Sequence, residues 1–281
     1  MKNLILTIFL FISIKSTAQL TFDKSILDCE NKWVAFPQDD DGSYKYGFIY
    51  MDSQYGLIFD YGGSFRINAV GKILASPKEE GASMKMPLNP SKILLAIIPE
   101  TDFEQFKINK ISNGFNSNVM KQGSVEWFYS WGTTYNTWSD CKKALESLEK
   151  AYKINSQYKG LDVQLAHSYN CLNQYSNAIN VLKKSIVANP TDPYVNKEYI
   201  FALAANQQLD LAIESYKKSL KVCPDTTYVP ENAFYILQGY FFKNDKKNFD
   251  KWLVETETVM YSNDQIKKIV EQMKIEIKKN K

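Results

Sequence analysis

The spacing of apolar and polar residues divides the chain into two parts with different periods. From Leu20 to about Gly123, short β-type runs alternate with turn signals, whereas apolar residues beyond residue 124 recur at helical spacing. A period of two is typical of half-buried strands, and a spacing of three to four is typical of amphipathic helices. We therefore expect an α+β protein, with a mainly antiparallel β domain at 19–124 followed by a helical domain.

In the β-type part, the strongest strand signal is an aromatic alternation at residues 44–51. Runs at 32–36, 57–61 and 64–68 also predict strands, with turns at 37–43, at 52–56 and at Gly62-Gly63. The apolar run at 93–99 predicts a buried strand. A segment of this length has room for one core, and a small sandwich or open barrel fits the pattern.

The helical part repeats with a period of 34 residues, most clearly in its small residues. Ala144, Ala178 and Ala212 follow one another at this interval, and each opens an apolar helix. Such a period indicates a helix-turn-helix unit that buries its apolar face by stacking on copies of itself. We predict three units, at 125–158, 159–192 and 193–226.

The pattern resembles the tetratricopeptide repeat (TPR), in which small residues mark the closest approach of two helices and a proline ends the second helix. The positions that carry the resemblance are Gly132, Tyr135 and Ala144 in the first copy, Ala166, Tyr169, Ala178 and Pro190 in the second, and Ala212 and Pro224 in the third. The first copy departs from the pattern at Ser156, and the third at Ile200 and Leu203. The resemblance implies an α-α superhelix.

Beyond Pro224 the pattern weakens. Residues 227–260 predict a degenerate fourth unit, in which Phe249 stands where alanine is expected. Residues 261–281 predict a capping helix behind a Ser262-Asn263-Asp264 cap, since the terminal units of a solenoid are atypical. Its apolar face consists of Ile266, Ile269, Val270, Met273 and Ile277.

In the TPR family, the first helix of each unit typically lines a concave groove that receives a peptide or a partner helix. The residues at those positions here are Tyr129, Thr133, Asn136, His167, Asn170, Lys197 and Phe201. Aromatic and amide side chains suit an extended protein segment. A solvated groove, or one filled by the protein's own β domain, is the alternative. The carboxylate clamp of chaperone-docking relatives is missing, since its positions hold Tyr129, Thr133, Tyr194 and Glu198.

The first residues have the composition of an export signal. Lys2 precedes an apolar run at 4–14, and Ser16-Thr17-Ala18 provides a cleavage site, so we expect residues 1–18 to be removed. The apolar run is too short to span a bilayer comfortably. The chain looks like exported bacterial TPR proteins with a β-rich N-terminal domain, which implies a periplasmic or extracellular location in a Gram-negative-type envelope.

Charge argues against nucleic acid as a partner. Removal of Lys2 and Lys15 with the signal would lower the formal charge from +3 to +1, and Arg66 is the only arginine. Binding to phosphate backbones needs a basic excess, and base readout relies on arginine. A protein or peptide is the partner class that we expect.

Four cysteines allow three disulfide pairings, which sequence alone does not resolve. Cys141 and Cys171 fall on neighbouring predicted helices, so they are the pair to test. The favoured alternative is that Cys29, Cys141, Cys171 and Cys223 are all small buried residues.

Two further motifs in the β-type part have functional and structural interpretations. Tyr44, Tyr46, Phe48 and Tyr50 would bind glycans if their rings were exposed, but core packing is the favoured interpretation. The acidic run at 39–42 lacks the bidentate glutamate of a calcium loop, so a hairpin turn is favoured there.

No catalytic motif stands out in the sequence. The serine-hydrolase elbow, the zinc-protease helix motif and the phosphate-binding glycine loop are all missing, and His167 is the only histidine. A carboxylate-dependent hydrolase would need a facing pair, for which Glu100 with Asp102 and Glu255 with Glu257 are the candidates. We therefore expect a binding protein without catalytic residues, metal or cofactor.

Overall fold

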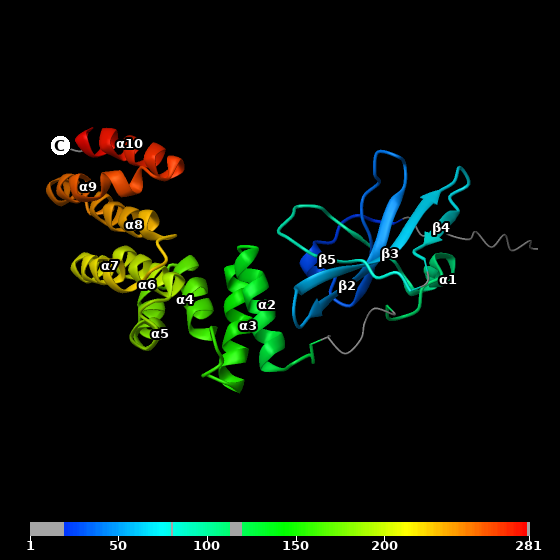
Figure 1. Ribbon diagram of the computed structural model, residues 1–281. Coiled ribbons are helices and arrows are strands. Elements are labelled where there is room, and N and C mark those ends of the chain that lie inside the picture. Colours follow the sequence, from blue (N-terminus) through cyan, green and yellow to red (C-terminus); the bar gives the residue numbers. More distant parts are fainter. Residues whose placement is uncertain (1–19, 80, 113–119, 280–281) are drawn as a thin grey trace, which may run out of the picture. The chain divides into compact units, whose positions relative to one another are not determined.

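A computed structural model of the protein describes residues 20–79, 81–112 and 120–279. The chain divides into two compact units between Val119 and Met120, and each unit is described by itself. Figure 1 shows an antiparallel sheet in the first unit and a succession of helices in the second. The α+β order predicted from the sequence is therefore confirmed. The predicted removal of residues 1–18 falls on residues outside the described part.

The first unit contains one antiparallel sheet, in which the strands follow the order β4-β3-β2-β1-β6 and β5 pairs with β3. The strands are β1 (Lys32–Ala35), β2 (Tyr44–Asp52), β3 (Gly56–Ile67), β4 (Ile73–Pro77), β5 (Lys85–Pro87) and β6 (Ala96–Ile97). Short helices are η1 (Ile26–Asp28), η2 (Glu100–Asp102) and α1 (Phe103–Phe106). The described residues thus form a single sheet, and the expected sandwich or open barrel is not what they show.

The turn predicted at Gly62-Gly63 is wrong, because β3 runs through both glycines. The pairing of β2 with β3 shifts between Tyr46 and Gly47, which makes a β-bulge opposite these glycines. A Cβ atom on Gly62 would lie 2.6 Å from Cζ3 of Trp33. The glycines therefore allow a close approach within the sheet, which the sequence pattern alone does not distinguish from a turn.

The aromatic side chains of β2 form the core of the first unit. Tyr46, Phe48 and Tyr50 are buried, and Tyr46 lies 5.0 Å, between ring centroids, from Phe106. Tyr44 is half-buried and stacks on Phe65 at 4.8 Å. Because a glycan needs exposed rings, the glycan-binding alternative fails on its own requirement, and core packing is the correct interpretation.

The second unit is built from helical hairpins. Its helices are α2 (Val125–Thr137), α3 (Cys141–Ile154), α4 (Leu161–Cys171), α5 (Tyr175–Ala188), α6 (Pro193–Ala205), α7 (Leu209–Val222), α8 (Val229–Phe242), α9 (Lys246–Met260) and α10 (Asp264–Lys279). Successive first helices of the hairpins, α2, α4, α6 and α8, pack on one another. In Figure 1, α4, α6 and α8 lie along one side of the array and α5, α7 and α9 along the other.

The turn inside each of the first three hairpins repeats at the 34-residue interval. Ser139, Asn173 and Gln207 have left-handed backbones, with φ of 61°, 59° and 61°. In each turn the next residue donates its N–H to the carbonyl five residues earlier, as Asp140 does to Tyr135 at 2.9 Å. This is a Schellman ending, which satisfies the last carbonyls of the first helix. The sequence period is therefore a period of backbone geometry as well.

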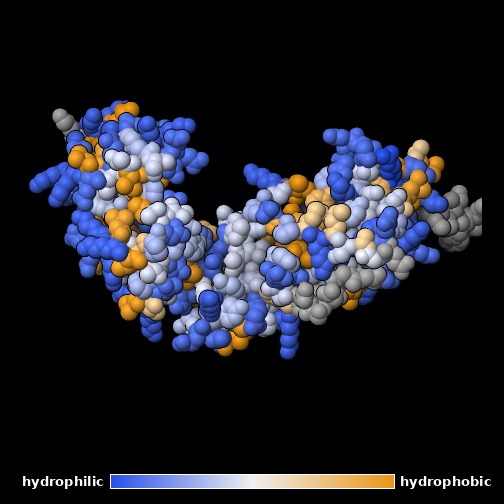
Figure 2. All heavy atoms as spheres, in the orientation of Figure 1, coloured by the Kyte–Doolittle hydropathy of each residue, from blue (hydrophilic) through white to orange (hydrophobic). Residues whose placement is uncertain are grey.

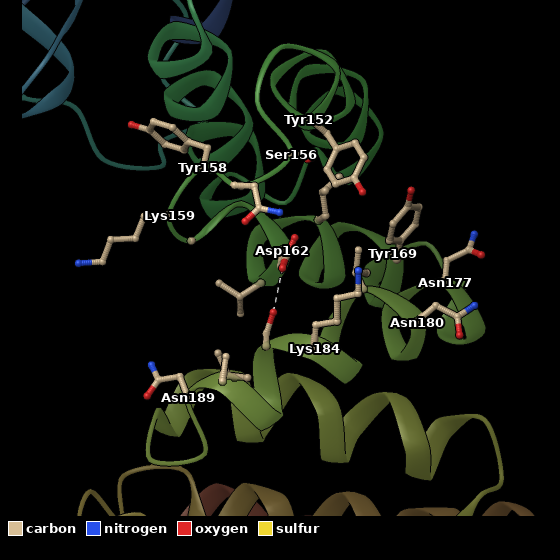
Figure 3. Close-up of a pocket in the computed structure, with 18 of the residues that line it drawn as sticks. Tyr152, Ser156, Tyr158, Lys159, Asp162, Tyr169, Asn177, Asn180, Lys184 and Asn189 are labelled. Carbon is tan, nitrogen blue, oxygen red and sulfur yellow. Dashed lines mark hydrogen bonds between the residues drawn. The ribbon is translucent and has the colours of Figure 1, made fainter.

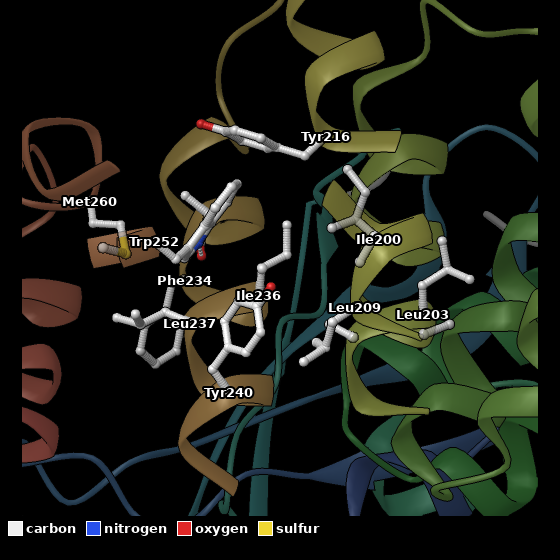
Figure 4. Close-up of a cluster of buried hydrophobic side chains, with 14 of the residues drawn as sticks. Ile200, Leu203, Leu209, Tyr216, Phe234, Ile236, Leu237, Tyr240, Trp252 and Met260 are labelled. Carbon is white, nitrogen blue, oxygen red and sulfur yellow. Dashed lines mark hydrogen bonds between the residues drawn. The ribbon is translucent and has the colours of Figure 1, made fainter. Parts of the chain in front are cut away.

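Small residues allow the two helices of a hairpin to approach closely. Ala144, Ala178 and Ala212 are fully buried, and a Cβ on Gly132 would lie 2.4 Å from Cγ of Leu148. In α9 the equivalent position holds Phe249, which is also fully buried. The fourth hairpin accommodates this larger ring in an aromatic core with Phe234, Tyr240 and Trp252, part of which Figure 4 shows.

Helix α10 closes the array. The Asn263 side chain accepts hydrogen bonds from the N–H groups of Gln265 and Ile266, so the predicted cap is present. Ile266, Val270, Met273 and Ile277 are buried, whereas Ile269 is 42% exposed. Figure 2 shows hydrophilic side chains projecting from the α9 and α10 end. None of the described helices is both long enough and apolar enough to cross a bilayer.

Cys141 and Cys171 form a disulfide that joins the start of α3 to the end of α4, with their Cα atoms 6.2 Å apart. The pair selected from the sequence is confirmed, and the favoured alternative of four unbonded cysteines is wrong. Cys29 is buried and Cys223 half-buried, and both are free thiols. Disulfides persist in oxidising compartments, so the bond fits an exported protein.

Candidate functional site

A ladder of polar side chains links successive first helices of the hairpins. Asn136 on α2 donates to the backbone oxygen and to Oε1 of Gln164 on α4, both at 3.0 Å. One repeat later, Asn170 on α4 donates to the backbone oxygen of Glu198 on α6 at 3.1 Å and to its Oε2 at 2.8 Å. These bonds hold α2, α4 and α6 in a fixed relation, because buried amide groups need partners.

Glu198 is the centre of this ladder. Its carboxylate is 3% exposed, and Oε1 lies 3.0 Å from Nδ1 of His167 and 3.0 Å from Nζ of Lys197. Burial alone would raise the pKa of this carboxyl, but the hydrogen bond with His167 and the charge of Lys197 outweigh it and lower the pKa to about 2. Glu198 is therefore ionised and fixes the positions of three side chains on two helices.

Aromatic rings surround this charged centre. The Tyr194 hydroxyl lies 3.1 Å from Nδ1 of His167, and Nζ of Lys197 lies over the rings of Tyr194 and Tyr228, 4.8 Å and 5.4 Å from their centroids. Burial, followed by the nearby Glu198 charge, raises the pKa of Tyr194. The phenol therefore stays neutral, and the ammonium group makes cation–π contacts with two neighbouring rings, whose centroids lie 6.0 Å apart.

The rings continue along α6 and α8. Phe201 lies 4.8 Å from Tyr235 and 6.0 Å from Tyr175, between ring centroids. We call His167, Tyr194, Phe201, Tyr228 and Tyr235 the aromatic face; each of them is half-buried. Burial is also the first cause of the raised pKa of Tyr235. The aromatic face is thus largely neutral, since Lys197 and Glu198 compensate each other.

The seven predicted groove residues differ in burial and in their partners. His167, Lys197 and Phe201 lie at the aromatic face. Asn136 and Asn170 are buried and bond to neighbouring helices, so their amides are not available to a partner. The remaining two lie on α2, where Tyr129 packs on Tyr158 at 4.9 Å and the Thr133 hydroxyl donates to the Tyr129 carbonyl at 2.9 Å.

Sequence reasoning missed Glu198, Tyr194, Tyr228 and Tyr235 as members of this site. The signal was present in the 34-residue spacing, which relates Tyr194 to Tyr228 and Phe201 to Tyr235. The same spacing relates Gln164 to Glu198. Reading the repeat for its polar and aromatic positions, rather than only for its small residues, would have found them.

A cavity of about 1090 Å³ lies elsewhere, between α3 and α5 and above α4. Figure 3 shows Tyr152, Tyr169 and Lys184 facing into it and a hydrogen bond from Ser185 to Asp162 on its floor. We call it the α3–α5 cleft. None of the predicted groove residues lines it.

Most of the other candidate residues are engaged in ordinary surface pairs. The acidic run lies in the turn that joins β1 to β2, where Asp39 pairs with Lys45 of β2 at 3.0 Å and Asp41 with Arg66 of β3 at 3.2 Å. Three of the four carboxylates proposed for hydrolysis pair with lysines, namely Glu100 with Lys110, Glu255 with Lys217 and Glu257 with Lys274. The fourth, Asp102, is buried and accepts a hydrogen bond from the Thr101 hydroxyl at 3.3 Å. Neither carboxylate pair lines the α3–α5 cleft, so we do not propose a hydrolase.

Comparisons with known proteins add no identity to this geometry. No protein-family model matches the chain, and no curated protein is similar to it.

Proposed function

We propose that the protein is an exported scaffold, in which residues 125–281 form a TPR array that binds a protein or peptide partner. The repeated 34-residue hairpin turn, with left-handed residues at 139, 173 and 207, supports the TPR assignment. The disulfide between Cys141 and Cys171 supports export, because such bonds persist in oxidising compartments.

The aromatic face is the binding surface in this proposal, and one observation carries it. Five half-buried aromatic side chains come from α4, α6, α8 and the residue before α8, and their rings make contacts in two groups, His167 with Tyr194 and Tyr228, and Phe201 with Tyr235. The buried Glu198 fixes the orientation of His167. Rigid aromatic side chains offer large contact areas at low entropic cost, which is why they are enriched where proteins bind one another. A preorganised surface of this kind suits a partner segment with little net charge.

Capture from an envelope extract tests the proposal. The full chain is compared with a Phe201→Ala, Tyr228→Ala variant, which removes two rings and leaves the ladder at Glu198 intact. The matched control is a Val187→Ala, Leu220→Ala variant, which removes exposed apolar side chains from α5 and α7. We expect a protein retained by the wild type and by the control but lost by the aromatic variant. Equal capture by all three would refute the assignment of the aromatic face.

A further inference from the structure

The two ring nitrogens of His167 have different surroundings. Nδ1 lies 3.0 Å from Oε1 of Glu198 and 3.1 Å from the Tyr194 hydroxyl. Nε2 makes no hydrogen bond to any residue of the described part, and it is not one of the buried atoms there that lack a partner. Because the His167 side chain is 30% exposed, Nε2 is the nitrogen that a bound molecule can reach.

The ionised Glu198 decides which nitrogen of a neutral His167 ring carries the proton. A carboxylate only accepts hydrogen bonds, so Nδ1 bonds to it only as an N–H donor. In the other tautomer, the lone pair of Nδ1 would face the charged oxygen at 3.0 Å, and only the Tyr194 hydroxyl would donate to Nδ1. A hydrogen bond to a charged acceptor is about twice as strong as one between neutral groups. The Nδ1–H tautomer is therefore favoured, and Nε2 keeps a free lone pair.

Other contacts hold the Glu198 carboxylate in one orientation. Its Oε1 lies 3.0 Å from Nζ of Lys197, and its Oε2 accepts a hydrogen bond from Asn170 at 2.8 Å. The carboxylate is 3% exposed, so water does not compete for these contacts. The position of Nδ1, and with it the direction of the Nε2 lone pair, is therefore set before a partner binds.

The surroundings of Nε2 narrow the group that a partner would supply. The charges of Lys197 and Glu198 compensate each other, and a cation would lose its hydration beside the rings, so a neutral donor is favoured. Hydroxyl and amide side chains also carry acceptors, which would be left without a partner at this face, whereas the tryptophan indole is neutral and only donates. An indole also packs favourably against other aromatic rings, and Tyr194 and Tyr228 belong to the same group of rings as His167.

We propose that the aromatic face selects its partner through Nε2 of His167, which accepts a hydrogen bond from the indole N–H of a tryptophan in the partner. Glu198 is the positioning residue for this contact. The inference rests on the function proposed for the aromatic face, and it adds the chemical identity of the side chain that the face receives.

Nitrogen NMR tests the tautomer directly, because His167 is the only histidine and its ring signals need no assignment. The isotope-labelled, untagged full chain is measured at about pH 8, at the upper end of the range in which histidine ordinarily titrates. We expect a protonated Nδ1 and an unprotonated Nε2. A protonated Nε2, alone or together with Nδ1, would overturn the proposal.

Indole and benzofuran test the choice of donor, since the two ring systems have the same shape and only indole carries an N–H. Each is titrated into the labelled full chain, and binding is followed by the backbone amide signals. We expect indole to bind about fivefold more tightly than benzofuran, which is the effect of one neutral hydrogen bond. Equal binding of the two probes, or no binding of either, would overturn the proposal.

The His167→Phe variant separates recognition from a structural role, because it keeps a ring and removes both nitrogens. We expect the preference for indole to disappear in this variant, whereas a purely structural role would weaken both probes alike and keep the preference, which would overturn the proposal. Val187→Ala, at an exposed position on α5, is the control and should keep the wild-type preference. Circular dichroism checks the helical fold of both variants, and the two wild-type measurements decide the matter if His167→Phe does not fold.

The two proposals fail in different ways. If the aromatic face is not the partner surface, the aromatic variant and the wild type capture the same proteins from the envelope extract. If only the tryptophan contact is wrong, the capture still differs between them, but Nε2 is protonated or indole has no advantage over benzofuran.

Discussion

The polar ladder predicts that replacing Ala202 with serine stabilises the protein. The first rung of the ladder is the set of hydrogen bonds between α2 and α4. In it, Oδ1 of Asn136 accepts a hydrogen bond from the Ser168 hydroxyl at 2.8 Å. In the second rung, the position of Ser168 is taken by Ala202, and Oδ1 of Asn170 is buried without a partner. The third rung, between α6 and α8, also lacks a polar partner. Ala204 stands where the earlier repeats have Asn136 and Asn170, and Oδ1 of Asn232 on α8 is buried without a hydrogen-bond partner.

The expected gain follows from two opposing contributions. Satisfying a buried acceptor contributes about 1–2 kcal/mol, because leaving it unpaired costs its desolvation. Serine lowers helix propensity relative to alanine by roughly 0.5 kcal/mol. The hydroxyl adds one atom at a fully buried site, but the equivalent atom of Ser168 is accommodated in the preceding repeat. The net expectation for Ala202→Ser is a stabilisation of about 1 kcal/mol.

The assay is urea unfolding of the full chain, followed by the helical circular dichroism signal. A higher midpoint at an unchanged slope reports a gain in stability. Repeating the comparison in an Asn170→Ala background completes a double-mutant cycle, which isolates the coupling between the two positions. We expect a coupling of about 1 kcal/mol, with the benefit of serine lost when Asn170 is absent.

Two results would show this reasoning to be wrong. If serine changed stability by the same amount in both backgrounds, its hydroxyl would not be bonded to Asn170. If Ala202→Ser destabilised the protein only in the presence of Asn170, the two side chains would clash rather than bond, and equivalent positions of the repeats would not be structurally equivalent.

Three further predictions concern the helical unit. Since the pKa of Glu198 is lowered from the ordinary 4.5 to about 2, its ionised form contributes stability above about pH 4.5 that is lost as pH falls toward 2. Glu198→Gln should therefore lower the unfolding free energy at pH 7 by up to about 3 kcal/mol, a difference that narrows in acid titrations. Reduction of the Cys141–Cys171 bond, which spans 30 residues, should cost about 3–4 kcal/mol in urea unfolding, and unchanged stability would contradict this. Gly132→Ala should lower the melting temperature, because overpacking against Leu148 costs about 1–3 kcal/mol of unfolding free energy. An unchanged melting temperature would show that α2 and α3 can move apart without a loss of stability.

The sequence predicted the features that depend on local pattern. The helical hairpins and their closely packed alanines follow from a 34-residue period in small and apolar residues, and the strands 32–36 and 44–51 follow from alternation. Both patterns are set within one element or one repeat, so no knowledge of distant contacts was needed.

Features that depend on contacts between elements were not predictable. The alternation on β2 predicts that its aromatic rings share one side of the sheet. It does not predict that Phe106, from a distant segment, packs against them. Gly62-Gly63 has the composition of a turn, and only the pairing with β2 makes it a bulge. Asn136 and Asn170 occupy groove positions of the family pattern. The first helix of the following hairpin, however, supplies their partners, Gln164 and Glu198, and both asparagines are buried.

Photo-crosslinking in cells that make the protein tests the central claim, that the aromatic face binds a partner, most directly. A benzophenone side chain is placed at position 201 on α6, and, as the control, at the exposed position 183 on α5. The account predicts a specific protein adduct from position 201 and none from position 183. No adduct at position 201, or the same adduct from both positions, would contradict it.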